Sequence, residues 1–232
     1  MATKSDIPGN KVPEPSLRRL PWYLSCIKLL RNEGERYVSS TQISNATGID
    51  ASQIAKDLSY MQISGRTRVG YEIKALEEVL ERFLGFRQMH KAFLFGVGNL
   101  GGALLRDGGL AQFGMEIVAA FDVNPALVGR ELNQIPIYHM DSFEKYFSCK
   151  EVRIGILTVP IEVSQNITER IARSGIRAIW NFTPVRIRAP KRVVVQNTSL
   201  YAHLAVMFNR MQSIQELSDE DIRMGKQLSL RQ

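Results

Sequence analysis

Residues 93–105, FLFGVGNLGGALL, limit the possible folds of this chain more than any other stretch. Apolar residues lead into a glycine-rich turn, and the residues that follow can open a helix. Gly96 permits a tight turn, Gly98 lets the backbone approach a pyrophosphate, and Gly101 lets the helix pack closely on the strand. This spacing predicts a strand–turn–helix unit of the kind that binds dinucleotides.

The sequence after this turn favours the same interpretation. A second apolar segment ends at Asp122, about 20 residues after Gly101. A carboxylate there accepts hydrogen bonds from ribose hydroxyls and repels a 2′-phosphate, which favours NAD(H) over NADP(H). A glycine turn that serves packing alone is the alternative. The predicted phosphate-binding residues are Gly96, Val97, Gly98, Asn99, Leu100 and Gly101.

The second half of the chain alternates apolar strands with helices, which predicts an α/β domain with a parallel sheet covered on both faces. The expected strands are 91–96, 116–122, 152–160, 176–182 and 191–196, and the expected helices are 99–107, 141–147 and 161–174. Loops after two later strands are expected to line the crevice that receives the nicotinamide, although ordinary turn chemistry is an alternative. Their residues are Thr158, Val159, Pro160, Asn181, Phe182 and Thr183.

The first half has the pattern of short amphipathic helices. The expected helices are 17–35 with Ser16 as N-cap, 41–47 capped by Ser40, 51–62 capped by Asp50 with Gln53 completing a capping box, and 74–86. Two of them are joined by the short GID turn, which predicts a helix-turn-helix. Residues 63–73 are expected to form two extended pieces around an arginine-bearing turn, which together make a wing.

A winged helix-turn-helix predicts DNA binding, although a small helical bundle that binds no DNA has the same spacing. The second helix presents hydrogen-bonding side chains suited to base edges and phosphates, the wing can enter a minor groove, and the preceding helix start can meet a phosphate. The predicted DNA-binding residues are Ser39, Ser40, Thr41, Ser52, Gln53, Lys56, Ser59, Tyr60, Arg66 and Arg68.

The formal net charge of +7 makes a polyanionic partner plausible, but it does not locate the binding surface. Residues 1–85 hold twelve Lys or Arg and ten Asp or Glu, a balance of only +2. The chain has no apolar run of membrane-spanning length and its first ten residues are polar, so we expect a cytoplasmic protein without membrane contact. Cys26 and Cys149 have no neighbouring ligands, so no disulfide or metal site is expected.

The three histidines, His90, His139 and His203, stand in no recognisable catalytic arrangement. A DNA-binding domain fused to a dinucleotide domain without such a group favours a sensor over an enzyme. Two alternatives remain: an NAD-dependent oxidoreductase with a helical accessory domain, and a nucleotide-gated module whose helical domain binds protein.

Eight motifs in order, VPEPSLRRLPWYL, VSS, QIAKDLSY, VGY, GVGNLG, AFD, LTVP and NFTP, resemble those of the Rex redox-sensing transcriptional repressors. The resemblance covers residues 12–210. It implies a homodimer with a winged-helix domain over residues 1–85 that binds a pseudo-palindromic operator. It also implies a Rossmann domain over 86–198 that binds NADH or NAD+, and a C-terminal helix and tail over 199–232 that swap onto the partner subunit. NADH is expected to close the dimer and release the DNA.

The same resemblance assigns roles to single residues. Lys56 and Tyr60 match the recognition helix of the family, and Arg19 matches an arginine that links the DNA-binding domain to the cofactor site. Ser199 stands where the family commonly has an aspartate, and Asp107 lies near a position that is often aromatic. Our hypothesis is that Asp107 supplies the carboxylate that Ser199 lacks and pairs with Arg19 in one domain arrangement only.

Overall fold

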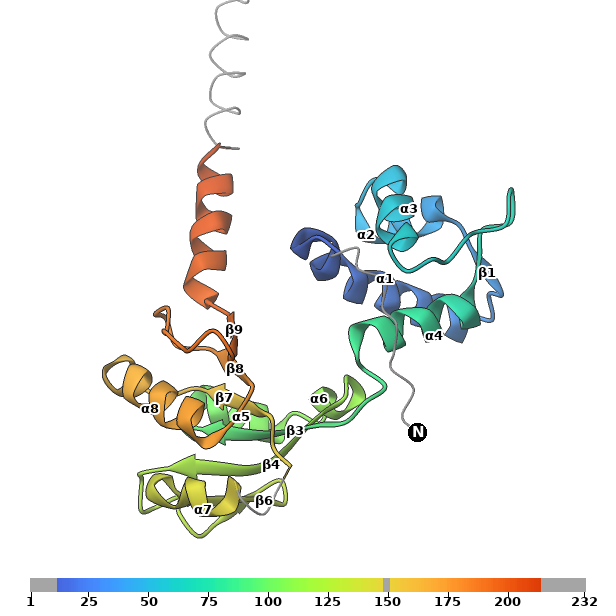
Figure 1. Ribbon diagram of the computed structural model, residues 1–232. Helices are drawn as coiled ribbons and strands as arrows, with labels where there is room; N and C mark the ends of the chain where they lie inside the picture. Colours follow the sequence, from blue (N-terminus) through green and yellow to red (C-terminus); the bar gives the residue numbers. More distant parts are fainter. Residues whose placement is uncertain (1–11, 148–150, 214–232) are drawn as a thin grey trace, which may run out of the picture. The chain divides into compact units, whose positions relative to one another are not determined.

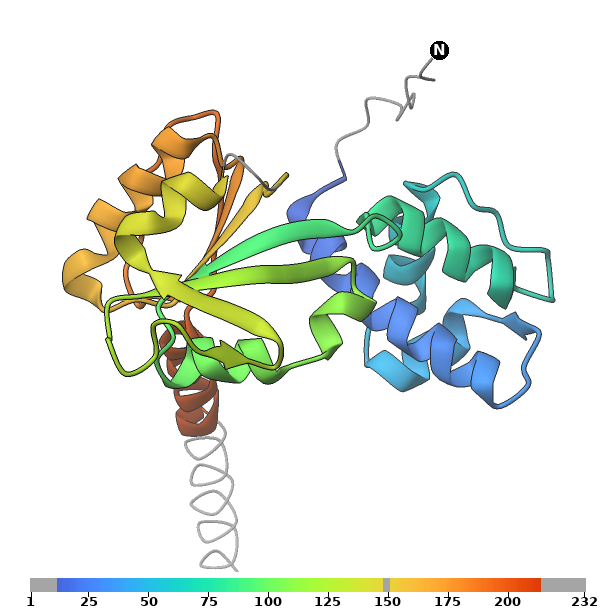
Figure 2. The same cartoon turned by 90° about the horizontal axis from the view of Figure 1, so that it is seen from below.

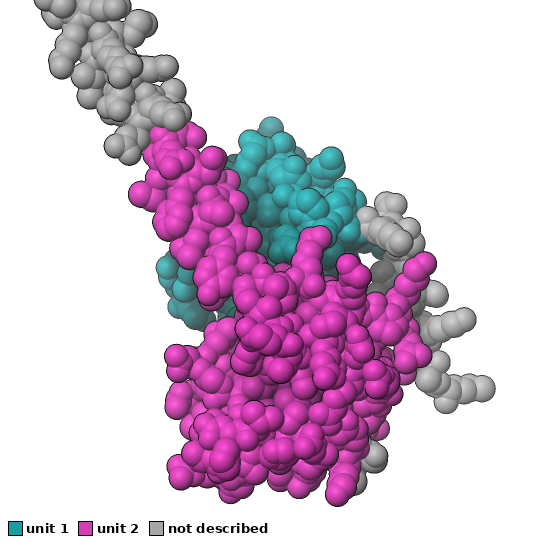
Figure 3. Space-filling model, turned by 90° about the vertical axis from the view of Figure 1, so that its left-hand side faces the viewer, with its two compact units in different colours: residues 1–89, 112–114 teal, residues 90–111, 115–232 magenta. Residues whose placement is uncertain are grey.

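The computed structural model describes residues 12–147 and 151–213 (Figure 1). Contacts divide the chain into two compact units, shown in different colours in Figure 3. The first unit runs to Met89 and also includes Gln112–Gly114, and the second contains His90–Ala111 and the chain from Met115 onward. Each unit has hydrophobic core clusters of its own.

The first unit has the expected helix-turn-helix and wing. Its elements are α1 (Glu14–Asn32), β1 (Tyr37–Val38), α2 (Ser40–Thr47), α3 (Ala51–Ser59), β2 (Tyr71–Glu72) and α4 (Ile73–Leu84). The two strands pair antiparallel, and the chain between α3 and β2 makes the turn of the wing. Buried apolar side chains of α1, α2, α3 and α4 form one core.

Two expected helix caps and one expected capping box differ from the structure. α1 begins at Glu14, where Pro15 in the first turn favours an earlier start, so Ser16 is buried inside the helix instead of capping it. α2 is capped by Ser39 rather than Ser40, because Gln42 lies three residues after Ser39 and completes a capping box. Asp50 does cap α3, but Gln53 does not close the box, because its side-chain amide bonds Asp57.

The second unit is a seven-stranded sheet with helices on both faces (Figure 2). Its elements are β3 (His90–Phe95), α5 (Asn99–Arg106), α6 (Gly109–Gln112, whose last residue groups with the first unit), β4 (Met115–Asp122), β5 (Glu131–Leu132), β6 (Ile135–His139), the 3₁₀ helix η1 (Met140–Ser142), α7 (Phe143–Phe147), β7 (Ile154–Leu157), α8 (Ile161–Ser174), β8 (Ala178–Asn181) and β9 (Val194–Asn197). The strand order is β5-β6-β4-β3-β7-β8-β9, and all pairs are parallel except β5 with β6.

This strand order confirms the expected Rossmann-like sheet and fixes where a ligand can bind. The chain runs outward from β3 through β4 to β6, then returns to the other side of β3 with β7. At such a reversal the loops after the two central strands diverge, and a crevice opens at their carboxyl ends. Gly96 follows β3, and Thr158 follows β7, so both lie at this edge.

Alternation along the strands divides the core between two faces. Phe93, Phe95 and Phe121 pack on the face covered by α7 and α8, where Phe143 joins them in edge-to-face contacts. Leu94 and its neighbours pack on the other face, toward α5. Fully buried strands of this kind read as continuous apolar runs, which is how they are recognised in the sequence.

The β5–β6 hairpin was not expected from the sequence. Its turn residues, Asn133 and Gln134, both adopt the left-handed conformation, with φ of 54° and 64°. Two-residue hairpin turns usually carry glycine there, and this one has none. The signal that predicts such a turn is therefore missing from residues 131–139.

Residues 200–213 form the expected C-terminal helix as far as the structure describes it, and each of them is exposed. Its large apolar side chains include Leu200, Leu204, Met207, Phe208 and Met211. The expected fraying after Leu217 lies outside the described residues, and the swap onto a partner stays a prediction. No helix in the described ranges combines the length and apolarity of a membrane span.

Candidate dinucleotide site and nucleic-acid interface

The glycine turn after β3 is held by close backbone packing. Gly96 has a φ of +94°, and a Cβ there would lie 2.8 Å from the carbonyl oxygen of Thr158. A Cβ on Gly101 would lie 2.0 Å from the carbonyl oxygen of Gly96. Both positions therefore exclude a side chain because of the protein's own packing, as the sequence predicts.

Gly98 differs, because its surroundings are empty. Its φ is −73°, which other residues adopt readily, and a Cβ there would meet no atom within 4 Å. No side chain caps α5, so the backbone N–H groups of its first turn are available to an anion. Open space above uncapped N–H groups fits a dinucleotide pyrophosphate.

Asp122 connects the end of β4 to this turn. Its Oδ2 accepts a hydrogen bond of 2.5 Å from the backbone N–H of Val97, and its Oδ1 accepts one of 2.8 Å from that of Asn124. Each carboxylate oxygen retains further acceptor capacity for a ribose hydroxyl. The carboxylate therefore fixes the shape of the turn and can still receive a ribose beside it.

The loop after β7 is tied to the same turn. The Thr158 hydroxyl donates to the carbonyl oxygens of Gly96 at 2.7 Å and Phe95 at 3.1 Å. Val159 is buried, whereas Pro160 is exposed as the N-cap of α8. Thr158 thus positions the loop, and Pro160 presents a surface at the crevice.

The loop after β8 is held by its own side chains. Asn181 is fully buried, donates to the carbonyl oxygen of Val185 at 2.8 Å, and accepts from the hydroxyl of Thr183 at 2.7 Å. Phe182 is only half-buried and lies against Trp180, with 4.6 Å between ring centroids. Asn181 and Thr183 therefore shape the loop, whereas the ring of Phe182 is partly accessible.

A cavity of about 440 Å³ adjoins the glycine turn, and two arginine side chains that belong to no motif of the sequence line it. Arg106, at the end of α5, and Arg130, before β5, line it together with Gly98 and Asn99. Arginine is well suited to phosphate oxygens. Arg106 lies seven residues after Asn99, on the same face of the predicted helix, so helical periodicity is a signal for it. Arg130 has no such signal, because its position depends on the β5–β6 hairpin.

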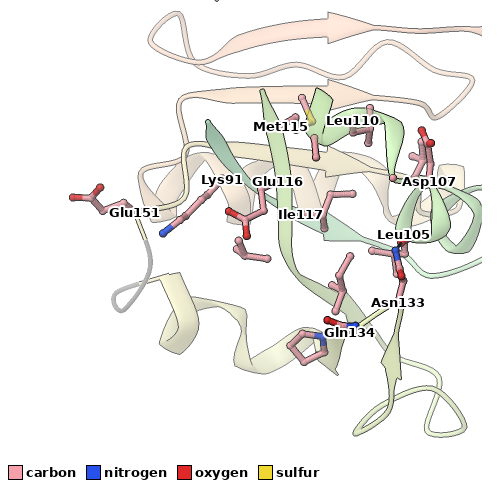
Figure 4. Close-up of a pocket in the computed structure, with 16 residues that line it drawn as sticks. Lys91, Leu105, Asp107, Leu110, Met115, Glu116, Ile117, Asn133, Gln134 and Glu151 are labelled. Carbon is pink, nitrogen blue, oxygen red and sulfur yellow. Dashed lines mark hydrogen bonds between the residues drawn. The ribbon is translucent and has the colours of Figure 1, made fainter. Parts of the chain in front are cut away.

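A larger cavity of about 770 Å³ lies elsewhere in the second unit (Figure 4). Lys91 and Glu116 line it from neighbouring positions near the start of β3 and β4, the opposite ends of these strands from the glycine turn. Asp107 and Asn133 also line it. This cavity is separate from the dinucleotide crevice.

The side chains of α3 that are predicted to read DNA differ in their exposure. Ser52, Lys56 and Ser59 are exposed, and Tyr60 is half-buried at the end of the helix. Gln53 is half-buried, and its amide nitrogen donates to Oδ1 of Asp57 at 2.8 Å. Three of the predicted side chains are thus exposed, and that of Gln53 is partly committed to the protein interior.

The other predicted DNA contacts lie at the start of α2 and on the wing. Ser39 caps α2, and Ser40 and Thr41 fall in its first turn. Arg66 contacts the hydroxyl of Tyr37 at 3.3 Å. Arg68 is exposed, with φ at +65° in the turn of the wing.

A charged cluster inside the first unit was not expected as a whole. Asp57 is 0% exposed and accepts hydrogen bonds from Arg19, Tyr23 and Gln53. Burial alone raises the pKa of Asp57, but the hydrogen bonds from Arg19, Tyr23 and neighbouring groups outweigh it and lower this pKa to about 2. An aspartate between Ile54 and Leu58 on the apolar side of α3 was the available signal.

The two other residues of the predicted signalling set have local partners. Oδ1 of Asp107 accepts a hydrogen bond of 2.8 Å from the backbone N–H of Gly109. The Ser199 hydroxyl accepts a hydrogen bond of 3.2 Å from the backbone N–H of Ala202, at the start of the C-terminal helix. Arg19 lies in the first unit and Asp107 in the second, so their pairing stays a prediction.

No group of three metal-ligating side chains occurs within residues 12–147 and 151–213. Two of the histidines have local backbone contacts. Nδ1 of His139 accepts a hydrogen bond of 3.3 Å from the backbone N–H of Asp141, and Nδ1 of His203 lies 2.9 Å from the carbonyl oxygen of Ser199. Burial raises the pKa of the Cys26 thiol, which makes it less reactive.

Comparison with protein families gives two matches that correspond to the two units. Residues 11–59 match a family described as a putative DNA-binding protein N-terminus, and residues 87–185 match one described as a CoA binding domain. Coenzyme A and NAD both contain an adenine nucleotide with a pyrophosphate, which the glycine turn suits.

Whole-chain comparisons give longer matches. The redox-sensing transcriptional repressor Rex of Bacteroides fragilis is 72% identical over 203 residues, which is 88% of this chain and 92% of that protein. A solved structure of RSP in complex with beta-NAD+ and operator DNA aligns with a TM-score of 0.83 at 29% identity, covering 90% of this chain and 96% of that one. The structure of RSP in complex with beta-NADH aligns with a TM-score of 0.81 at 28% identity, covering 90% of this chain and 99% of that one.

Proposed function

This chain belongs to the Rex family of redox-sensing transcriptional repressors, and we propose that it binds operator DNA as a homodimer and releases it when NADH binds. The observation that carries this proposal is the combination of two sites in one chain. An exposed, polar recognition face on α3 lies in one unit, and a glycine turn with open space above uncapped N–H groups lies in the other.

The residues of the second unit divide the work of binding the dinucleotide. The first turn of α5 receives the pyrophosphate, Asp122 receives the adenosine ribose, and Thr158 keeps the two loops together. Asp122 disfavours a 2′-phosphate, so NAD(H) is preferred over NADP(H). When bound, the cofactor supplies a nicotinamide ring that is neutral in NADH and positively charged in NAD+.

Discrimination between the two redox states must occur at the nicotinamide end, because the rest of the two molecules is identical. The partly accessible ring of Phe182 and the exposed Pro160 provide apolar surface at the carboxyl edge of the sheet. Apolar surroundings that exclude water penalise the charged ring, because burying an unpaired charge is costly. This surface therefore favours NADH.

Coupling to DNA requires a dimer whose shape depends on the cofactor. Half-site spacing on a duplex is fixed by the helical repeat, so a change in the distance between two recognition helices weakens binding. The exposed apolar side chains of residues 200–213 are the surface we assign to the partner subunit. A ligand shifts such an equilibrium only by its difference in affinity between the two dimer shapes.

Arg19, Asp107 and Ser199 form the proposed signalling set. We retain the hypothesis that Asp107 replaces the carboxylate absent at Ser199 and pairs with Arg19 in one dimer arrangement. Asp107→Ala should then reduce the effect of NADH on DNA binding. If this variant released DNA as the wild type does, the hypothesis would be wrong.

We propose no enzymatic activity, because the Rex relatives of this chain are named as transcriptional repressors. A duplex selected by the wild-type protein from a random library provides the test. Its affinity should fall when NADH is added at fixed salt, and NAD+ should have much less effect. Equal effects of NADH, NAD+ and coenzyme A would refute redox sensing, and hydride transfer from NADH to added carbonyl compounds would favour an oxidoreductase.

A further inference from the structure

We propose that Asp57 is a positioning residue of the recognition helix, which holds α3 in its DNA-reading rotation by its paired hydrogen bonds with Arg19 of α1. This inference rests on the proposed function, since it assumes that the exposed face of α3 reads DNA. It concerns a buried side chain that does not itself reach the nucleic acid.

The contacts between Asp57 and α1 define a single geometry. Arg19 donates from Nε to Oδ2 at 2.7 Å and from Nη2 to Oδ1 at 2.9 Å. The Tyr23 hydroxyl donates to Oδ2 at 2.8 Å from the next turn of α1. Two parallel bonds from a planar guanidinium fix the direction of the carboxylate, and a third bond fixes its position along α1.

The cost of breaking these contacts is high because the carboxylate is shielded from water. The Asp57 side chain is 0% exposed, whereas that of Arg19 is 22% exposed. A rotation of α3 that separates the pair leaves a buried charge without a partner, which costs more than the loss of a surface ion pair. Among the ion pairs of the described residues, this one alone joins α3 to another element.

The rotation of α3 determines what the helix presents to DNA. Ser52, Lys56 and Ser59 are spaced by four and three residues, so they share one exposed face. Asp57 lies on the buried face with Ile54 and Leu58. Apolar contacts are not directional, so they tolerate small rotations that paired hydrogen bonds do not. Asp57 therefore sets the direction in which the exposed face points.

A second ion pair with a buried carboxylate in the same unit provides a control. Nη1 of Arg31 lies 2.7 Å from both carboxylate oxygens of Glu77, whose side chain is 9% exposed. This pair joins α1 to α4 and leaves α3 untouched. Asp57→Asn and Glu77→Gln each convert a paired carboxylate into an amide of the same shape.

The experiment measures specific and non-specific DNA binding for both variants in the full-length protein. The probes are the selected duplex and a scrambled duplex of equal length, each titrated over a range of salt concentrations. We expect Asp57→Asn to lower affinity for the selected duplex by about tenfold or more, with little change for the scrambled duplex or in salt dependence. The reason is that base contacts need the correct helix rotation, whereas phosphate attraction does not. Glu77→Gln should leave the ratio of the two affinities unchanged.

Two outcomes overturn the proposal. The first is an unchanged ratio of specific to non-specific affinity in Asp57→Asn. The second is an equal loss of this ratio in both variants, because that result would mark a general effect of destabilising the unit. If circular dichroism shows that Asp57→Asn does not fold, Arg19→Lys replaces it. That variant keeps the charge and removes the paired geometry, so it should lower the ratio, and an unchanged ratio would again overturn the proposal. A wild-type protein that selects no duplex would instead refute the proposed function itself.

Discussion

A Cβ on Gly101 would lie 2.0 Å from the carbonyl oxygen of Gly96, whereas a Cβ on Gly98 would touch nothing within 4 Å. The glycines of one motif are therefore required for different reasons. Gly101 serves the packing of α5 against the turn after β3, and Gly98 leaves open space for a ligand.

This difference predicts opposite phenotypes for two alanine substitutions. Gly101→Ala forces the backbone apart and should lower the free energy of unfolding by about 2 kcal/mol or more. Gly98→Ala should leave folding unchanged and weaken NADH binding by about tenfold or more, because the methyl group occupies the space assigned to the pyrophosphate. Thermal melts and fluorescence titration with NADH measure the two effects. If Gly98→Ala bound NADH with wild-type affinity, the pyrophosphate would not lie above Gly98.

Asp122 should control the preference for NADH over NADPH. Asp122→Asn removes the negative charge and sets an amide NH2 group against one of the two backbone N–H donors, so NADH should bind at least about tenfold more weakly as the ribose bond and the turn are both weakened. The relative affinity for NADPH should rise, because a 2′-phosphate is no longer repelled. Calorimetric titration with both cofactors measures the ratio, which would remain at the wild-type value if Asp122 did not face the ribose.

Acid should destabilise the protein partly through Asp57. Its pKa of about 2 in the folded state lies below the usual value of 3.8, so its contribution to stability is complete above about pH 5. That contribution, about 2 kcal/mol, should be lost as the pH falls from about 4 to about 2, because the unfolded chain takes up the proton first. Urea unfolding of the wild type and Asp57→Asn across this range checks the slope. Identical pH slopes in both proteins would contradict the assignment.

Lys56 and Arg68 should each contribute to the salt dependence of DNA binding. Both are exposed, and neither has an ion-pair partner among the described residues. Lys56→Gln or Arg68→Gln should reduce the slope of log affinity against log salt by about 0.9 for each phosphate contact removed. Lys28→Gln is the control, since Lys28 pairs with Glu81 at 2.7 Å. An equal change in the control would show that net charge alone is responsible.

The sequence predicts the fold well where residue patterns are local. Continuous apolar runs identify β3, β4, β7, β8 and β9, and the glycine spacing identifies the turn after β3. The β5–β6 hairpin escapes prediction because Asn133 and Gln134 adopt left-handed conformations without glycine. Its structure is imposed by the pairing of β6 with β4, which is a tertiary contact.

The site is predicted less completely than the fold. Glycine and aspartate positions follow from a motif, but the use of Gln53 depends on a neighbour brought in by folding. The Gln53 side chain could close a capping box at Asp50 or bond Asp57. It bonds Asp57, because a hydrogen bond to a buried carboxylate is stronger than one at an exposed helix start. Arg130 enters the cavity beside the glycine turn only because the hairpin folds.

If cofactor and operator binding are coupled, thermodynamic reciprocity requires each ligand to change the affinity for the other. The affinity for NADH should be measured by titration in the absence of DNA and again with the selected duplex at saturating concentration. If NADH weakens duplex binding by a given factor, the duplex must weaken NADH binding by the same factor. Coupling requires two equal factors, which we expect to be about tenfold or greater, and an NADH affinity that is the same with and without duplex would show that the two sites are independent.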